Sequence, residues 1–419
     1  MRTRPSAPRT TNWRRFAVLL VAVGLGVGAG GAIGFLAQGQ PIRPEAAPPI
    51  GAPPSHPSTP SSPSPLRLSP ITPDTMLAWT PGGIPSGFAR SVGKLPGIDH
   101  VVAVTSGTAW LSRSFDASGA QVDRPPAGLA IPLEVAGADL QLYSAFLSPA
   151  DRAVLPQLAR GQAVLGATSA RLRRLGPGAT LLFGSRRVRV AGVLPDAAIG
   201  AHEVFVSRAT ATALGVGHER YLLIDPAQNA SREALATRIR SLLPEGTQLR
   251  IRGPGETPFF RQGDAVLPPV KIKEVFGEFA ARPISGGFLR IDPRWEKRHI
   301  VMVSVPILGA VRCNRALIPQ LREALGEIVA RGLSHLIHPW DYGGCYAPRF
   351  INENPLVGIS HHAWGVAVDV NVSSNQFGQT PHQDPRVVAV FERWGFTWGG
   401  SWLRPDGMHF EFVRFPTAG

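Results

Sequence analysis

Cysteine is scarce in this chain of 419 residues, which contains only Cys313 and Cys345. The two lie too far apart for a CxxC redox motif or for the paired cysteines of a zinc finger. If the chain is exported, one disulfide between them is one interpretation, and two unrelated buried thiols are the other. The sequence leaves both open, because it does not define the distance between their Cα atoms.

Acidic residues are also few. The chain has 29 Asp and Glu against 43 Lys and Arg, which gives a net charge of +14 and a pI of about 11.0. Such a balance favours polyanionic partners, which include nucleic acids, anionic membranes and cell-wall polymers. The basic residues are mostly arginines scattered along the chain, without a helix-turn-helix pattern, zinc-finger spacing or a basic helix interleaved with aromatic residues. We therefore expect no nucleic-acid partner.

The N-terminal region has the pattern of a membrane anchor. Residues 1–15 contain five arginines and no acid, and residues 16–36 contain no charged residue. An apolar run of this length spans a bilayer, and the basic flank predicts that residues 1–15 stay in the cytoplasm. A cleaved signal peptide is the alternative. We favour the anchor, because the run is long and no A-x-A cleavage site follows it; both interpretations export the rest.

Residues 37–75 form a predicted linker. Twelve of the 33 residues from 41 to 73 are proline, mixed with Ser, Thr and Ala. This composition favours an extended, polyproline-like chain that reaches on the order of 100 Å at about 3.1 Å per residue. It would carry the later domains away from a membrane and into a thick wall, although an ordinary interdomain linker has the same composition.

Residues 76–258 predict an α+β domain. The segment 187–193 alternates at period two, as a half-buried strand does. Further predicted elements are strands at 101–104, 204–206, 221–224 and 248–252 and a helix at 231–243. The run from Ala163 to Asp196 resembles the extracellular domain of the MacB/FtsX class of permeases. This resemblance implies binding or positioning of a membrane-protein partner, and a passive spacer is the alternative.

A third domain, residues 265–419, contains two segments rich in metal-ligating side chains. Residues 360–369 read SHHAWGVAVD, and residues 406–409 read DGMH. A hydrolytic zinc site needs three protein ligands, an open position for water and a carboxylate that moves a proton. Alternation along a strand puts Asp369 on the face opposite the neighbouring valines. The two segments therefore predict a zinc site.

The pattern S-x-H-x-x-G-x-A-x-D in residues 360–369 resembles the signature of a family of zinc peptidases that cut peptidoglycan stem peptides. The family includes D-alanyl-D-alanine carboxypeptidases, dipeptidases and L-alanyl-D-glutamate endopeptidases. The resemblance extends over about 150 residues, from Val270 to Phe415. It implies an α+β domain with a small antiparallel sheet. It favours His362 over the adjacent His361 as the ligand, through its spacing to the glycine and the aspartate.

The resemblance also implies a role for each site residue. His362, Asp369 and His409 would bind zinc, while Asp406 would act as general base and then acid. Arg349 would orient the substrate. Ser360 and Tyr346 are expected to contact the substrate as well. Glu411 stands where several relatives have a histidine, and we expect it to hold an imidazole.

These expectations describe an exported, membrane-anchored zinc peptidase on the wall side of the cell membrane. A binding module that grips wall peptides without cutting them is the alternative. The scissile bond is open: Asp406 favours the endopeptidase branch, whereas an arginine that reads a terminal carboxylate, here Arg349, favours the carboxypeptidase branch.

Overall fold

The structure is a computed structural model that describes residues 74–257 and 259–416. The described chain is mixed α and β, with a small antiparallel sheet near its C-terminal end. The expected cytoplasmic tail, membrane anchor and nearly all of the linker lie outside these residues. Within the described part, no helix combines the length and the apolar character that a bilayer-spanning segment requires.

A sheet of nine strands forms the framework of residues 76–252. Its strand order is β3-β7-β4-β6-β5-β2-β8-β1-β9, and β2 also pairs with β3. The strands are β1 (Met76–Trp79), β2 (Ile98–Phe115), β3 (Ile131–Ala138), β4 (Ala163–Gly166), β5 (Thr180–Phe183), β6 (Arg186–Leu194), β7 (Val204–Ser207), β8 (Glu219–Pro226) and β9 (Arg250–Arg252).

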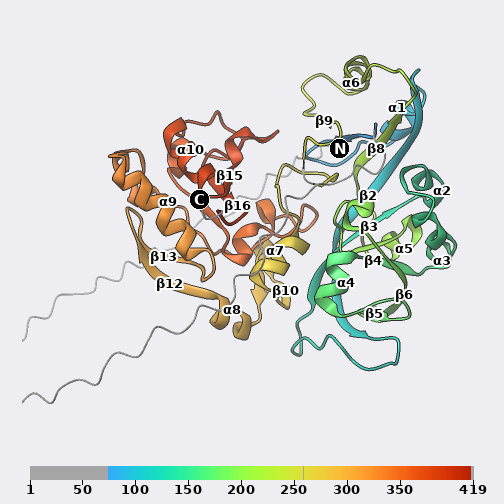
Figure 1. The fold of residues 1–419 in the computed structure, drawn as a ribbon, viewed down its shortest axis with the longest axis horizontal. Helices are drawn as coiled ribbons and strands as arrows, with labels where there is room; N and C mark the ends of the chain where they lie inside the picture. The colour runs from blue at the N-terminus through green and yellow to red at the C-terminus, as the bar shows by residue number, and fades with distance from the viewer. Residues whose placement is uncertain (1–73, 258, 417–419) are drawn as a thin grey trace, which may run out of the picture. The chain divides into compact units, whose positions relative to one another are not determined.

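The 18-residue strand β2 joins two parts of this sheet, as Figure 1 shows. It pairs antiparallel with β3 and β5, and these pairings close β2, β3, β7, β4, β6 and β5 into a ring. The first residues of β2 pair with β8 instead, which extends the sheet through β1 to β9. Strand β9 is therefore the edge strand at the end of this extension.

Four of the five predicted strands lie within β2, β6, β7 and β8, and the fifth, 248–252, is shorter in the structure, where it forms β9. The predicted alternation between core and solvent is seen in β6. In β6, Val188 and Val190 are buried while Arg187 and Arg189 are exposed. The helices of this domain are α1 (Phe88–Val92), α2 (Leu140–Tyr143), α3 (Leu155–Ala159), α4 (Ala167–Arg173), α5 (Arg208–Ala213) and α6 (Arg232–Ser241). The predicted helix at 231–243 corresponds to α6, whose N-terminal amide of Ala234 donates to the Ser231 hydroxyl.

The C-terminal domain surrounds one hydrophobic core. The three-stranded sheet has the order β14-β16-β15, and two hairpins, β10-β11 and β12-β13, precede it. The elements are α7 (Pro269–Phe276), β10 (Ala281–Pro283), β11 (Leu289–Ile291), α8 (Pro293–His299), β12 (Ile300–Val305), β13 (Gly309–Asn314), α9 (Ile318–Ala330), β14 (Ala367–Asp369), α10 (Pro385–Arg393), β15 (Phe396–Trp398) and β16 (His409–Phe412).

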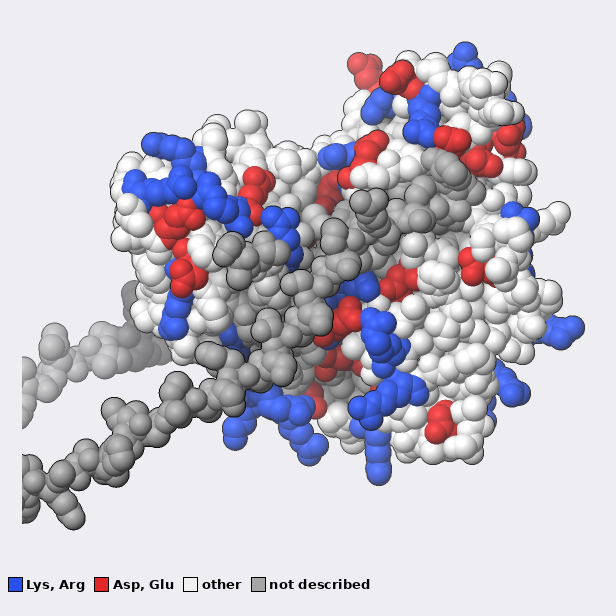
Figure 2. All heavy atoms as spheres, in the orientation of Figure 1, with Lys and Arg blue, Asp and Glu red and all other residues white. Residues whose placement is uncertain are grey.

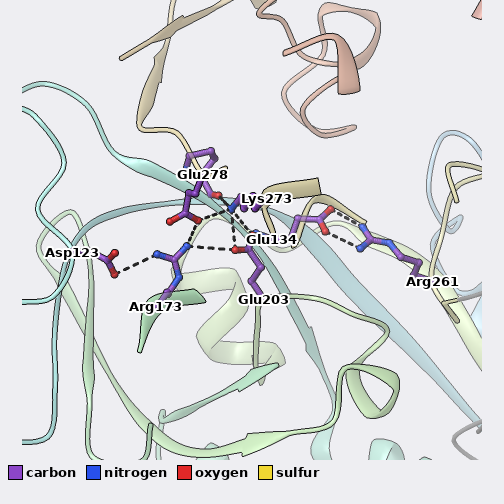
Figure 3. A network of polar contacts seen from close by, with 8 residues as sticks. Asp123, Glu134, Arg173, Glu203, Arg261, Lys273 and Glu278 are labelled. Carbon is purple, nitrogen blue, oxygen red and sulfur yellow. Dashed lines mark hydrogen bonds and ion pairs between the residues drawn. The ribbon is translucent and has the colours of Figure 1, made fainter. Parts of the chain in front are cut away.

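A buried ionic network joins α7 to the preceding domain (Figure 3). Lys273 Nζ lies 2.8 Å from Glu203 Oε2 and 3.2 Å from Glu278 Oε1. Arg173 pairs with Glu278 and lies 3.3 Å from Asp123 Oδ2. The side chains of Arg173, Glu203 and Lys273 are at most 1% exposed. Each charge therefore depends on its neighbours rather than on water for stabilisation.

Figure 3 also shows a second pair beside this network, between Glu134 and Arg261. The guanidinium donates to both carboxylate oxygens, at 2.6 and 2.7 Å. Burial opposes ionisation of Glu134, but the charge of Arg261 prevails and lowers the pKa of the carboxyl. On the face drawn in Figure 2, basic side chains occur in separate groups with acidic side chains between them.

Candidate metal centre

The pairing of β14 with β16 brings the two predicted zinc-binding segments together. Their register sets Asp369 opposite His409 and Ala367 opposite Glu411. Val368 and Phe410 point to the other face and are fully buried in the core. Because side chains alternate along a strand, both ligand candidates face the same side of the sheet. His409 Nδ1 then lies 3.0 Å from Asp369 Oδ1.

His362 reaches the site from a short 3-10 helix, His361–Trp364, rather than from an irregular loop. Ser360 caps this helix, because its hydroxyl accepts a hydrogen bond from the amide of His362 at 3.3 Å. Gly365 ends the helix with a φ of 67°, in the region that glycine adopts without steric cost. A Cβ atom at Gly365 would lie 2.7 Å from the amide nitrogen of Asn314. The close approach of β13 therefore requires glycine here.

Three donor atoms converge at the centre of the site. His362 Nε2 lies 3.2 Å from His409 Nδ1 and 3.2 Å from Asp369 Oδ2. In a tetrahedral zinc site, bonds of about 2.0–2.1 Å place neighbouring donor atoms roughly 3.3 Å apart. The observed separations match this spacing, so His362, Asp369 and His409 form a donor set that fits one zinc ion.

Hydrogen bonds on the far side of each imidazole define which nitrogen is free to bind a metal. His362 Nδ1 lies 2.9 Å from the carbonyl oxygen of Cys345 and must donate to it. This leaves Nε2 as the lone-pair nitrogen that faces the centre. His409 presents Nδ1 to the centre, while its Nε2 lies 3.2 Å from Glu411 Oε2. Both imidazoles are therefore oriented by a second partner.

Glu411 is buried between two imidazoles. Its Oε2 atom lies 2.7 Å from His361 Nδ1 and 3.2 Å from His409 Nε2. Burial raises the pKa of Glu411, but the neighbouring His361 and His409 outweigh it and hold the pKa well below its usual range. Asp369 and Glu411 in turn overcome the burial of His409 and raise its pKa to about 10. The site thus attracts positive charge at His409, whether carried by a proton or by a metal ion.

Asp406 lies on the turn before β16, half-buried, with its backbone oxygen accepting from the amide of His409 at 3.2 Å. Burial raises the pKa of its carboxyl, and the negative charge of Asp369 adds to this rise. Its Oδ1 atom is buried and has no hydrogen-bond partner among the described residues. A buried carboxylate oxygen without a partner is costly, so this atom is available for a ligand or a proton.

Burial raises the pKa of Asp406, and the charge of Arg349 lies close enough to offset a small part of this rise. Its guanidinium is partly exposed and has no hydrogen bond or ion pair with any other described residue. The backbone links it to the helix that carries His362, because its carbonyl oxygen accepts from the amide of Ser360 at 3.1 Å. Arg349 is therefore near the metal ligands and free to bind an anionic or carbonyl group.

Tyr346 has partners of its own. Its hydroxyl donates to Glu296 Oε1 at 2.5 Å, and the guanidinium of Arg312 lies 4.6 Å from the ring centroid. Burial and Glu296 raise the pKa of the phenol. These contacts occupy the hydroxyl, and the expected contacts of Tyr346 and Ser360 with a substrate stay predictions.

The two cysteines are joined in a disulfide, with their Cα atoms 5.3 Å apart. Cys313 lies in β13, and Cys345 supplies the carbonyl that orients His362. The sequence did not indicate this second role, because it belongs to the backbone of the cysteine and not to its thiol. Trp402 also lies at the site, with its ring centroid 5.2 Å from that of His409.

Two family models match the chain. Residues 356–412 match a model described as D-alanyl-D-alanine carboxypeptidase, which includes all three metal-ligand candidates and Asp406. Residues 18–242 match a MacB-like periplasmic core domain. The first match supports a peptidase at the level of the family, and the second supports an extracytoplasmic domain of a membrane protein.

Solved structures give similar matches for the middle of the chain. The periplasmic region of MacB from Actinobacillus actinomycetemcomitans is 16% identical, with a TM-score of 0.30, and the match covers 43% of this chain and 88% of that one. The extracellular domain of the noncanonic ABC-type transporter YknZ from Gram-positive bacteria is 14% identical, with a TM-score of 0.29 and coverages of 43% and 98%. No curated protein matches the chain. Because its family-model match extends over more than half of the residues, this chain belongs to the family of proteins with a MacB-like periplasmic core domain.

Proposed function

We propose that this protein is a zinc metallopeptidase that hydrolyses peptide bonds in peptidoglycan stem peptides outside the cytoplasm. The observation that carries the proposal is the convergence of His362, Asp369 and His409 at the donor spacing of a tetrahedral zinc site. The carboxypeptidase model that matches residues 356–412 supports the reaction class. Both ligating nitrogens are oriented by partners on the far side of their rings, as zinc-binding histidines are.

Zinc, when bound, would supply a Lewis acid and lower the pKa of a coordinated water to about 7. His362 would hold it through Nε2 and His409 through Nδ1, since the other nitrogen of each ring faces a hydrogen-bond acceptor. Asp369 would supply the anionic ligand. Three protein ligands leave one position of the tetrahedron open, which is the arrangement of catalytic rather than structural zinc sites.

Asp406 is the residue that we assign to proton transfer. Its unpartnered Oδ1 atom would accept a proton from the attacking water and return it to the leaving amine. Burial raises the pKa of this carboxyl, and a raised pKa brings a carboxyl closer to the range in which it both accepts and donates protons near neutral pH. A positioned acid–base group contributes about 10² to 10⁴ in rate.

Arg349 would orient the substrate. Its free guanidinium presents a planar fork of N–H donors, which binds a carboxylate through two hydrogen bonds and a carbonyl oxygen through one. A terminal carboxylate in this position would make the enzyme a carboxypeptidase, whereas a polarised internal carbonyl would make it an endopeptidase.

The MacB-like match and the N-terminal sequence support the location. We propose that residues 16–36 anchor the chain in the cell membrane and that the proline-rich linker lets the peptidase domain reach the wall. The middle domain would contact a membrane-protein partner, a role that its match to a MacB-like periplasmic core domain suggests.

The test is product analysis on a defined stem peptide by mass spectrometry with the purified full-length protein. We expect new products that disappear after treatment with a chelator and return after zinc is added. Loss of one D-alanine identifies a carboxypeptidase, and cleavage between L-alanine and D-glutamate identifies an endopeptidase.

The Asp406→Asn variant separates catalysis from metal binding. It should bind zinc with the stoichiometry of the unaltered protein and lose most of its turnover. Asp116→Asn is a suitable control, because Asp116 accepts hydrogen bonds in an exposed turn of the middle domain. Binding of wall peptides without any cleavage by the unaltered protein would favour the non-catalytic binding module instead.

A further inference from the structure

The loop that carries Asp406 is held at both ends by its own domain. This loop comprises residues 399–407. The carbonyl oxygen of Gly399 accepts from the amides of Trp402 at 3.1 Å and of Asp406 at 2.9 Å, which closes the loop. The amide of Gly378 donates to Pro405 O at 2.6 Å. These bonds leave Leu403, in the middle of the loop, without a backbone partner in the peptidase domain as far as the described residues show.

Leu403 finds its partners in the middle domain and in the segment that directly follows it instead. Its amide donates to Asp264 Oδ2 at 2.7 Å, and its carbonyl oxygen accepts from Gln248 Nε2 at 3.4 Å. Its side chain packs against the hydrophobic cluster of the middle domain that includes Leu77 and Trp79. Both backbone groups and the side chain of one residue thus bind the neighbouring domain.

Asp264 is itself rigidly placed. Arg252, in the edge strand β9, donates from Nη2 to Asp264 Oδ1 at 2.6 Å and from Nη1 to Gly263 O at 2.8 Å. Arg250 Nη2 lies 3.6 Å from the same carboxylate. The side chains of Asp264 and Arg252 are 8% and 7% exposed. The Leu403 amide therefore donates to a buried side chain that Arg252 holds in place, and charge-assisted hydrogen bonds are roughly twice as strong as neutral ones.

A second loop near the metal ligands is held in a similar way. Phe350 and Ile359 pair as an isolated bridge and close the segment between them, directly after Arg349 and before Ser360. Leu356, near the far end of this segment, accepts through its carbonyl oxygen from Arg220 Nη1 at 3.2 Å. Arg220 lies in β8 and is 6% exposed. The strands β8, β1 and β9 are neighbours in the sheet. One region of the middle domain therefore holds both loops, directly through Arg220 and by way of Asp264 through Arg252.

We propose that the middle domain and the segment that directly follows it complete the peptidase site, with Asp264 as a positioning residue for Asp406 and Arg220 as a positioning residue for the loop between Arg349 and Ser360. The inference rests on the proposed peptidase function. Asp264 does not touch the reacting atoms, and it acts through Leu403, three residues before Asp406. A catalytic group displaced by about 1 Å loses on the order of 10²-fold in rate, so this contact is expected to appear in kcat.

The test compares variants of the full-length protein on the stem peptide that the unaltered enzyme cleaves. Asp264→Ala removes the acceptor of the Leu403 amide, and Asp264→Asn keeps an oxygen that can accept from it. Leu403→Ala removes the packing contact from the other side and leaves the pair of Asp264 with Arg252 intact. Glu219→Gln is the matched control, because it removes the partner of Arg208 in the same domain, 2.5 Å away.

We expect Asp264→Ala to lower kcat by about 10- to 100-fold, with KM within about twofold and the same zinc content. Asp264→Asn should recover part of this loss, Leu403→Ala should also lower kcat, and Glu219→Gln should leave it unchanged. A purely structural role would lower the melting temperature without this separation of kcat from KM. Should Asp264→Ala fail to fold, Asp264→Asn and Leu403→Ala still decide the question.

The inference is overturned if Asp264→Ala retains the kcat of Glu219→Gln, or, where Asp264→Ala does not fold, if Asp264→Asn and Leu403→Ala both retain it. Failure of the proposed function looks different, because the unaltered protein would then cleave no stem peptide with zinc bound.

Discussion

Replacement of Glu411 by glutamine should weaken zinc binding. Glu411→Gln conserves the shape of the side chain and removes its charge. In the structure, Glu411 is 2% exposed and its Oε2 atom lies 3.2 Å from His409 Nε2. With Nδ1 of His409 on the metal, Nε2–H donates to this carboxylate, and the negative charge increases the basicity of the ligating nitrogen. Glutamine would still accept the hydrogen bond but would not supply the charge.

The size of the effect follows from this geometry. Loss of an outer hydrogen-bond partner typically weakens metal affinity by about 10- to 100-fold, which equals roughly 1.4 to 2.8 kcal/mol. We expect the upper part of this range, because Glu411 is buried and its charge is little screened by water. Its second neighbour, His361 Nδ1 at 2.7 Å, also loses a charged partner, so the position of the 3-10 helix that carries His362 is affected as well.

Zinc affinity can be measured by competition with a chelating dye. Glu327→Gln serves as the control, because Glu327 accepts from Trp394 Nε1 at 2.7 Å and pairs with Arg393, away from the metal ligands. The control should bind zinc as the unaltered protein does. An unchanged zinc dissociation constant in Glu411→Gln would refute the idea that this carboxylate tunes His409.

Three further predictions concern stability. Joint replacement of Cys313 and Cys345 by alanine should lower the free energy of unfolding in urea by about 3–4 kcal/mol, because the disulfide spans a sequence separation of 32 residues; a loss below about 1 kcal/mol would contradict this. Gly365→Ala should cost about 1–3 kcal/mol, because the φ of 67° and the amide of Asn314 both oppose a Cβ atom, and an unchanged melting temperature would show the backbone to be more adaptable. Burial, with a smaller contribution from the charge of Arg261, lowers the pKa of His202 to about 3 in the folded protein. Below pH 6.5 the unfolded state therefore binds more protons than the folded state, so the free energy of unfolding decreases as the pH is lowered. At pH 5 the protonation of His202 in the unfolded state lowers the free energy of unfolding by about 2 kcal/mol. The decrease between pH 7 and pH 5 should therefore be smaller in His202→Gln than in the unaltered protein, and equal decreases would contradict this assignment.

Local patterns were enough to identify the candidate ligands, because the relevant information lies within a few residues. The alternation along residues 366–370 predicted that Asp369 turns away from the buried valines, and the structure gives this arrangement in β14.

The contacts between distant segments could not be read in this way. The register that sets Asp369 opposite His409 joins strands forty residues apart, and neither strand encodes its partner. The anchoring of Leu403 by Asp264 depends on two domains that are separate in the sequence. The sequence patterns also did not predict that β2 pairs with both β3 and β5. Local patterns identify a strand, but the neighbours of that strand depend on the topology of the whole sheet.

The ionic network around α7 determines where this chain can be cut. A fragment that ends before α7 would lose Lys273, the nearest cation to the carboxylate of Glu203. Burial already raises the pKa of Glu203 in the whole protein, so the shortened fragment should take up a proton there more readily unless the side chain reaches water. A peptidase domain transplanted without its neighbour would keep the pair of Lys273 with Glu278 but would lose Glu203 and Arg173, their partners in the middle domain. Wherever the boundary is placed around α7, an exchange of domains between such proteins must therefore keep Lys273 and Glu203 together from one source.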